Sequence, residues 1–148
     1  MQLLLLQPCR IREGKMQPHL VTSLTVLSIL GIIDSIYLFY KHKRKQPLAC
    51  PLNTDCNAVM NSKWSTTFGI RNELFGAIYY LIILIGAFVL YYNYISMIHY
   101  ILIAFSSLAL LFSAFLMYLQ KYIIKEYCFY CIISAILTFL IFIVILVI

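Results

Sequence analysis

Charged residues are scarce in this sequence, and acidic residues are the fewest of all. Aspartate and glutamate number five in 148 residues, and charged residues of both signs make up only 11% of the chain. Hydrophobic residues make up 64%, and the mean hydropathy is +0.94. Soluble globular domains carry roughly a quarter charged residues, so this composition excludes a soluble globule. Lipid must therefore surround most of the chain.

The net charge of +6 does not indicate a nucleic-acid partner. Almost all of the 11 lysines and arginines lie outside the apolar stretches. Positive residues that flank membrane helices interact with lipid headgroups and set the orientation of the helices. We therefore expect the lipid bilayer as a partner, and no nucleic acid.

Four apolar stretches are long enough to cross a membrane. The hydrocarbon core of a bilayer is about 30 Å thick, which takes roughly 20 residues of helix. Links of only a few residues join the last three stretches, so neighbouring helices must run antiparallel. The predicted fold class is an all-α membrane protein, a four-transmembrane-helix bundle. We predict one membrane domain over residues 20–148, with spans at about 20–40, 74–92, 97–119 and 127–148.

Residues 1–19 are predicted to be an N-terminal cytosolic tail. Four leucines precede the first positively charged side chains of this segment. A secretory signal has the opposite order, with positive charge before its apolar core. Met16 is an alternative start of the chain, and Cys9 is interpreted as an inert small hydrophobic residue.

The first span carries a single acidic residue, Asp34. A carboxylate within a membrane span is a functional candidate by default. Asp34 lies near the far end of the predicted helix, however, where such side chains more often meet headgroups or water. The sequence leaves both interpretations open.

Residues 41–73 form the only long polar segment, and exposed chemistry is expected there. Asp55 is a suitable N-cap for a short helix over residues 56–63, because an Asp side chain accepts a hydrogen bond from a free N–H group of the first helical turn. Residues 68–69, Phe-Gly, are predicted to turn the chain back toward the bilayer.

Four cysteines lie where the predicted fold brings them together. Cys50 and Cys56 belong to the polar segment, and Cys128 and Cys131 form a C-x-x-C motif at the start of the last span. The polar segment follows the first predicted span and the C-x-x-C motif begins the fourth, so the chain crosses the membrane twice between them. Both cysteine pairs are therefore expected on the same face of the membrane. The C-x-x-C sulfurs lie one helical turn apart, and free N–H groups at a helix N-terminus favour the Cys128 thiolate. A pair in a loop over a pair fixed in a helix suits a relay of thiol–disulfide exchange.

Two other functions fit the same four cysteines. Two cysteine pairs can supply the four thiolates of a zinc site, and a soft-metal-binding or metal-transporting membrane protein is the main alternative. The relay is favoured because structural zinc usually organises a small soluble knuckle, whereas Cys131 lies in an apolar helix that a lipid-dissolved oxidant reaches. We therefore predict no metal site. In a purely structural membrane subunit, the third alternative, no cysteine substitution would alter a redox activity.

Four short motifs surround the cysteines. They are Cys56-Asn-Ala-Val-Met-Asn-Ser62-Lys-Trp64, Phe68-Gly69, Asn72-Glu-Leu-Phe75-Gly76 and Tyr127-Cys128-Phe-Tyr-Cys131. Together they resemble the vitamin K epoxide reductase-like family over about residues 20–148, and the combination is far more specific than any one motif. The five residues between the loop cysteines resemble the bacterial, disulfide-forming branch of the family.

The resemblance implies a bundle that encloses one quinone, ubiquinone or menaquinone, with the polar segment as a lid. It implies that Cys50 accepts electrons from a thioredoxin-fold thiol oxidase and that Cys56 passes them to Cys128. Cys131 then delivers them to the quinone, which makes the protein a quinone-dependent disulfide oxidoreductase. The other implied positions are Asn72, Phe75 and Tyr80 for quinone binding, and Ser62 and Trp64 in the lid. Vertebrate members carry a tyrosine where this chain has Ala135, which weakens any expectation of epoxide chemistry.

Two observations conflict over the orientation in the membrane. Three lysines and arginines lie in the N-terminal tail, against six in the long loop and two before the last span. The positive-inside rule therefore places the cysteines in the cytosol, whereas disulfide chemistry is typical of oxidising compartments outside it. In the family that this sequence resembles, the cysteines normally face an oxidising compartment. We therefore expect a bacterial inner or plasma membrane protein whose cysteine loop is extracytoplasmic.

Overall fold

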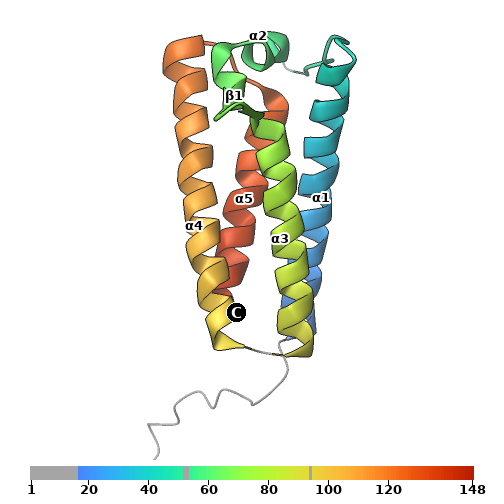
Figure 1. Ribbon diagram of the computed structural model, residues 1–148, viewed down its shortest axis with the longest axis vertical. Coiled ribbons are helices and arrows are strands. Elements are labelled where there is room, and N and C mark those ends of the chain that lie inside the picture. Colours follow the sequence, from blue (N-terminus) through green and yellow to red (C-terminus); the bar gives the residue numbers. More distant parts are fainter. Residues whose placement is uncertain (1–16, 52–53, 94) are drawn as a thin grey trace, which may run out of the picture.

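Four long helices form a bundle in the computed structural model, which describes residues 17–51, 54–93 and 95–148. They are α1 (Pro18–Lys43), α3 (Asn72–Tyr92), α4 (Ser96–Leu119) and α5 (Phe129–Val147). Each is long and apolar enough to cross a membrane, α4 being continued by a π-helical turn, η2 (Gln120–Ile124). Figure 1 shows the helices running side by side along the long axis. The predicted all-α membrane bundle is confirmed, and the chain is a multi-pass membrane protein.

The helix ends lie within three residues of the predicted ones. α1 begins at Pro18, whose fixed φ suits a first helical turn. It continues past the predicted end to Lys43, and the basic residues of its last turn interact favourably with the negative end of the helix dipole. Cys9 and Met16, in the predicted tail, lie outside the described residues.

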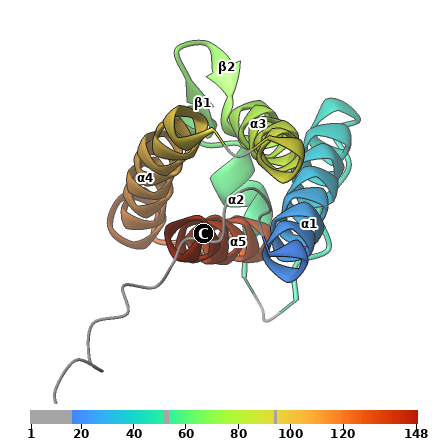
Figure 2. The ribbon, with the colours of Figure 1, turned by 90° about the horizontal axis from the view of Figure 1, so that it is seen from below.

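Tyr80 joins three of the helices at the centre of the bundle. α1 packs against α3 and α5, and α5 packs against α4; Figure 2, a view along the bundle, shows α3 between α1 and α4. The Tyr80 ring is fully buried and lies so close to Gly31 of α1 that a methyl group on this glycine would be 2.5 Å from three ring atoms. The Tyr80 hydroxyl contacts Ser134 Oγ at 2.8 Å and Thr138 Oγ1 at 3.2 Å, both on α5.

The polar segment covers the upper end of the bundle in Figure 1. Residues 56–71 form what we call the lid. The lid consists of α2 (Cys56–Met60), a 3-10 turn, η1 (Lys63–Ser65), and a hairpin of β1 (Thr66–Thr67) and β2 (Ile70–Arg71).

The local geometry at the start of the lid and at its hairpin agrees with two of the sequence predictions. Asp55 is the N-cap of α2, and its Oδ1 accepts a hydrogen bond of 3.0 Å from the Ala58 N–H. Phe68 and Gly69 form the hairpin turn with φ values of 52° and 77°, in the left-handed region. α2 is shorter than predicted, because the chain leaves the helix after Met60 and enters η1.

Asp34 lies deeper in the bundle than predicted. Because α1 extends to Lys43, more than two helical turns separate Asp34 from the end of the helix. Its Oδ2 atom is buried. Asp34 is therefore a partly buried residue of the bundle, with one buried carboxylate oxygen.

Candidate active site

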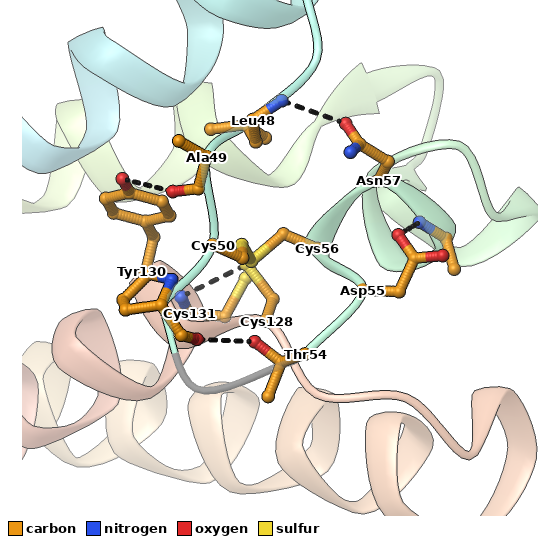
Figure 3. The surroundings of a disulfide bond; sticks show 12 residues. Leu48, Ala49, Cys50, Thr54, Asp55, Cys56, Asn57, Cys128, Tyr130 and Cys131 are labelled. Atoms are coloured by element: carbon orange, nitrogen blue, oxygen red, sulfur yellow. Dashed lines mark hydrogen bonds between the residues drawn. A yellow bond between two sulfur atoms is a disulfide. The ribbon is translucent and has the colours of Figure 1, made fainter.

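All four predicted site cysteines lie at the lid end of the bundle. Cys50 and Cys56 form a disulfide whose Cα atoms are 6.1 Å apart, and Cys128 and Cys131 are free thiols. Figure 3 shows the disulfide together with both thiols at the start of α5. The structure thus holds one oxidised and one reduced cysteine pair.

A small apolar cluster contains both pairs. Cys56 and Cys128 have no exposed surface, and Cys50 and Cys131 pack against the same cluster. The cluster also contains Leu38 at the end of α1 and Leu48, Val59 and Met60 around α2. Water is therefore excluded where the two pairs meet, while Cys50 keeps partial exposure toward the outside.

Two hydrogen bonds fix the chain before Cys50. The Leu48 N–H donates to Asn57 Oδ1 of α2 at 3.1 Å. The Tyr130 hydroxyl, on the first turn of α5, donates to the Ala49 carbonyl oxygen at 3.1 Å. Both bonds are drawn in Figure 3. The loop cysteine is thus attached both to the lid and to the helix that carries the free thiols.

Cys128 is the N-cap of α5, so the C-x-x-C motif lies at the start of the last helix as predicted. Its sulfur accepts a hydrogen bond of 3.4 Å from the Cys131 N–H. A hydrogen bond from the Cys131 thiol, together with the N–H groups of Cys131 and Tyr130, lowers the pKa of Cys128 below its ordinary value, and outweighs the opposing effect of burial. A thiol with a lowered pKa ionises readily and is a good leaving group in disulfide exchange.

Gln120 holds the backbone of Cys128 and is not among the site residues predicted from the sequence. Gln120 begins η2, is buried, and its Oε1 accepts a hydrogen bond of 3.0 Å from the Cys128 N–H. One weak signal was available, because Gln120 is an uncharged polar residue at the end of an apolar span. The π-helical turn itself has no sequence signature that would have placed this side chain beside the C-x-x-C motif.

We expect the substitution Gln120→Met to destabilise this end of the bundle. Methionine has a similar length but no carbonyl oxygen, so the buried Cys128 N–H would lose its acceptor, at a cost of about 1–3 kcal/mol in the free energy of unfolding. Thermal unfolding in detergent measures the loss. Lys121→Met, the same replacement at the exposed neighbour, is the control and should stay within about 0.5 kcal/mol of wild type. Equal stability of both variants would contradict the role given to Gln120.

An apolar cavity of about 420 Å³ lies between the four helices and the lid. This volume lies within the range of small-molecule sites. Cys131 is part of its wall, together with aromatic and aliphatic side chains such as Phe105, Leu108 and Phe112. The cavity wall also includes every predicted quinone-binding and lid residue: Asn72, Phe75, Tyr80, Ser62 and Trp64.

The polar groups among these residues already make hydrogen bonds within the protein. Asn72 Nδ2 donates to the Trp64 carbonyl oxygen at 2.8 Å, and its Oδ1 accepts from Thr67 at 2.8 Å. Ser62 Oγ donates to the Val59 carbonyl oxygen at 2.7 Å. Asn72 therefore fastens the hairpin to the start of α3. An amide nitrogen carries two hydrogens, so one hydrogen of Asn72 is left for a ligand.

Two of the four site cysteines are joined to each other in this structure, which bears on the metal alternative. Over residues 17–51, 54–93 and 95–148, no group of three or more His, Cys, Asp or Glu side chains is placed to hold a metal ion. Two of the four sulfurs are joined in the Cys50–Cys56 disulfide, and a disulfide sulfur is not a thiolate ligand. In this state one cysteine pair is oxidised and the other is reduced.

A disulfide packed in one cluster with a dithiol can exchange electrons by sulfur attack. The fold and these two pairs therefore define a membrane-embedded thiol oxidoreductase. A sequence model of the vitamin K epoxide reductase family matches residues 22–146, and the chain belongs to this family. The match includes all four cysteines and reaches into all four long helices. The family resemblance inferred from the motifs is thus confirmed, and this is a family of oxidoreductases.

Proposed function

We propose that this protein reoxidises a disulfide-forming protein of the thioredoxin fold and passes the two electrons to a membrane quinone, ubiquinone or menaquinone. The supporting observation is the order of the parts from outside to inside. The partly exposed Cys50 is joined to the buried Cys56, the buried Cys128 lies in the same cluster, and Cys131 is part of the cavity wall. We infer that this protein belongs to the bacterial, disulfide-forming branch of the family.

The first exchange takes place at the loop pair. A thiolate of the reduced partner attacks Cys50, which forms a mixed disulfide and releases Cys56 as a thiolate. The second cysteine of the partner then attacks its own sulfur in that mixed disulfide. The partner leaves with a disulfide, and Cys50 and Cys56 remain as two thiols that carry both electrons.

The second exchange moves the electrons inward. Cys56 attacks Cys128 in a Cys128–Cys131 disulfide, and Cys131 leaves as a thiolate. Cys50 then attacks Cys56, and Cys128 leaves as the second thiolate, which its lowered pKa favours. The result is an oxidised loop pair over two free thiols, the arrangement that the structure contains.

The cavity suits the ring and isoprenoid tail of a quinone. Its walls are mainly apolar, its size is appropriate, and Asn72 and Asp34 are among the few polar residues that line it. Asn72, Phe75 and Tyr80 would hold the ring beside Cys131, with Ser62 and Trp64 in the lid above. A bound quinone supplies the oxidising potential that turns the two thiols into a Cys128–Cys131 disulfide, taking up two electrons and two protons.

Quinone reduction by the purified full-length protein tests the proposal. The protein in detergent is mixed with a reduced thioredoxin-fold oxidase and, in turn, with ubiquinone or menaquinone analogues, and the loss of quinone absorbance is followed. We expect turnover that depends on all three components. If no quinone is reduced and the reduced protein instead binds zinc or copper stoichiometrically, the proposal is wrong and the metal alternative replaces it.

We also propose that the cysteine end faces the extracytoplasmic side. All eight described lysines and arginines lie toward this end, against the positive-inside rule, but the proposed partner works in an oxidising compartment. Ile148 lies at the opposite end of the bundle in Figure 1. A green fluorescent protein fused after Ile148 is therefore expected to fluoresce, and alkaline phosphatase fused there to be inactive in bacterial cells. The reverse pattern would place the cysteines in the cytosol.

A further inference from the structure

We propose that Asp34 carries a proton between the Cys131 thiol and the electron acceptor in the cavity. This inference rests on the proposed function and adds to it the route of the proton. The carboxylate belongs to α1, which carries none of the four cysteines, and it lines the same cavity as Cys131.

The surroundings of Asp34 leave one carboxylate oxygen without a partner. Oδ2 is buried and accepts no hydrogen bond from the described residues. A buried oxygen without a hydrogen bond is costly, and most native proteins avoid it. An ionisable group within a membrane span is costly as well. Both costs are accounted for if this oxygen binds a proton or a ligand atom during turnover.

The position of Asp34 is fixed by its neighbour. Ser35 is buried where α1 meets α3, so closely that a methyl group on Gly76 would lie 3.0 Å from its hydroxyl oxygen. Asp34 is thereby held at the cavity wall. Its charge raises the pKa of Cys128, at the start of α5, and so opposes the hydrogen bonds that lower it.

No other acidic side chain of the described residues is placed for this role. Glu73 also lines the cavity, but both of its oxygens accept hydrogen bonds from Arg71, at 2.8 and 3.1 Å. Asp55 caps α2, and Glu126 is exposed in the link before α5. Asp34 is therefore the one carboxylate in the described chain that combines a place on the cavity wall with an unpaired oxygen.

The proposed step balances protons and electrons. When Cys128 and Cys131 form a disulfide, two S–H bonds break, one S–S bond forms, and two electrons and two protons go to the quinone, which becomes a hydroquinone. The Asp34 carboxylate accepts the proton that leaves Cys131 and then donates it to a quinone oxygen. Asp34 ends ionised, as it began, so no further co-reactant is needed.

Removal of the carboxylate gives two effects of opposite direction. In Asp34→Asn, quinone turnover should fall about a hundredfold, the size typical of a lost acid–base group. The Asp34 charge opposes ionisation of Cys128, so in reduced, quinone-free protein the Asn variant should react faster than wild type with a small neutral maleimide at neutral pH. The unfolding temperature should stay unchanged. A variant that is only misfolded or destabilised would not show slower turnover together with faster alkylation.

The pH dependence gives a further measurement. As the pH is lowered, Asp34 binds a proton from solution and can no longer accept the proton of Cys131, so wild-type turnover should fall. Asp34→Asn has no carboxylate to protonate, so this fall in turnover should be missing from its pH profile. Thiol titration remains in both proteins, so the difference between the profiles isolates the carboxylate. The titratable groups that face Asp34 are Tyr80 and Glu73 on α3 and Cys128, Tyr130 and Cys131 at the start of α5.

Two variants serve as controls for the Asp34 proposal. Ser28→Ala removes the other buried unpaired side-chain oxygen of α1 and should change neither turnover nor the alkylation rate. Asp34→Glu keeps a carboxylate and should recover at least a tenth of wild-type turnover. If Asp34→Asn turns over at the wild-type rate, or Asp34→Glu is as slow as Asp34→Asn, the proposal is wrong. In both cases an inactive Cys131→Ser variant would still support the proposed function. Failure of the Asp34 proposal can therefore be told apart from failure of the proposed function.

Discussion

Quinone reduction is expected to fall at least about 10³-fold in Cys131→Ser, since removal of a reacting nucleophile commonly costs that much or more. Cys131 is the only one of the four cysteines on the cavity wall. A serine hydroxyl is nearly isosteric but does not form a disulfide with Cys128. The fold and the cavity should therefore survive while the last electron transfer is lost.

The same variant should accumulate a trapped intermediate. Cys128 is expected to attack Cys56 of the loop disulfide, and without Cys131 nothing on the helix side resolves the Cys56–Cys128 bond. Mass spectrometry of peptides under non-reducing conditions measures this bond. Cys50→Ser, which leaves both helix thiols intact, is the matched control and should reduce quinone when a small dithiol replaces the partner. Wild-type turnover in Cys131→Ser would refute the electron path through the C-x-x-C motif.

Gly31→Ala is expected to destabilise the bundle by about 1–3 kcal/mol, the usual cost of overpacking a well-packed core. The added methyl group would lie 2.5 Å from three atoms of the Tyr80 ring. This ring has no room to move, because it is fully buried and its hydroxyl is held by Ser134 and Thr138 of α5. Either Tyr80 loses these hydrogen bonds or α1 moves away from α3.

The unfolding temperature in detergent measures this effect, and a second glycine provides the control. In Gly86→Ala the new methyl group would meet the end of the Leu102 side chain at 2.8 Å, which a change of leucine rotamer can relieve. Gly86→Ala should therefore cost much less than Gly31→Ala. Because Tyr80 also lines the cavity, Gly31→Ala should slow quinone turnover as well. Equal stability of the two alanine variants would show that Tyr80 does not fix the distance between α1 and α3.

The bundle and the four cysteines could be predicted from sequence because strong local signals specify them. Apolar runs of bilayer length define the spans, an even number of spans places both cysteine pairs at one end, and Asp55 signals the start of α2. The spacing of the C-x-x-C motif predicts two sulfurs one turn apart. Each of these signals can be read along the chain without knowing which side chains meet between helices.

The contacts between helices could not be predicted in this way. The depth of Asp34 depends on where α1 ends, and a hydropathy pattern gives that end only to within a turn. The contact of Gln120 with Cys128 depends on a π-helical turn that changes the direction of the side chain. Asn72 was predicted only as a quinone ligand, whereas its hydrogen bonds to Trp64 and Thr67 depend on the hairpin geometry.

The placement of both cysteine pairs at one end has a consequence for bioenergetics. Both pairs and the cavity wall around Cys131 and Asp34 lie in the lid-side part of the bundle, so the electrons and their protons travel together over a short path. Moving one charge across a bilayer against 100 mV takes about 2.3 kcal/mol, but the proposed reaction moves none. Disulfide formation by this protein should therefore proceed at the same rate in energised and de-energised membranes.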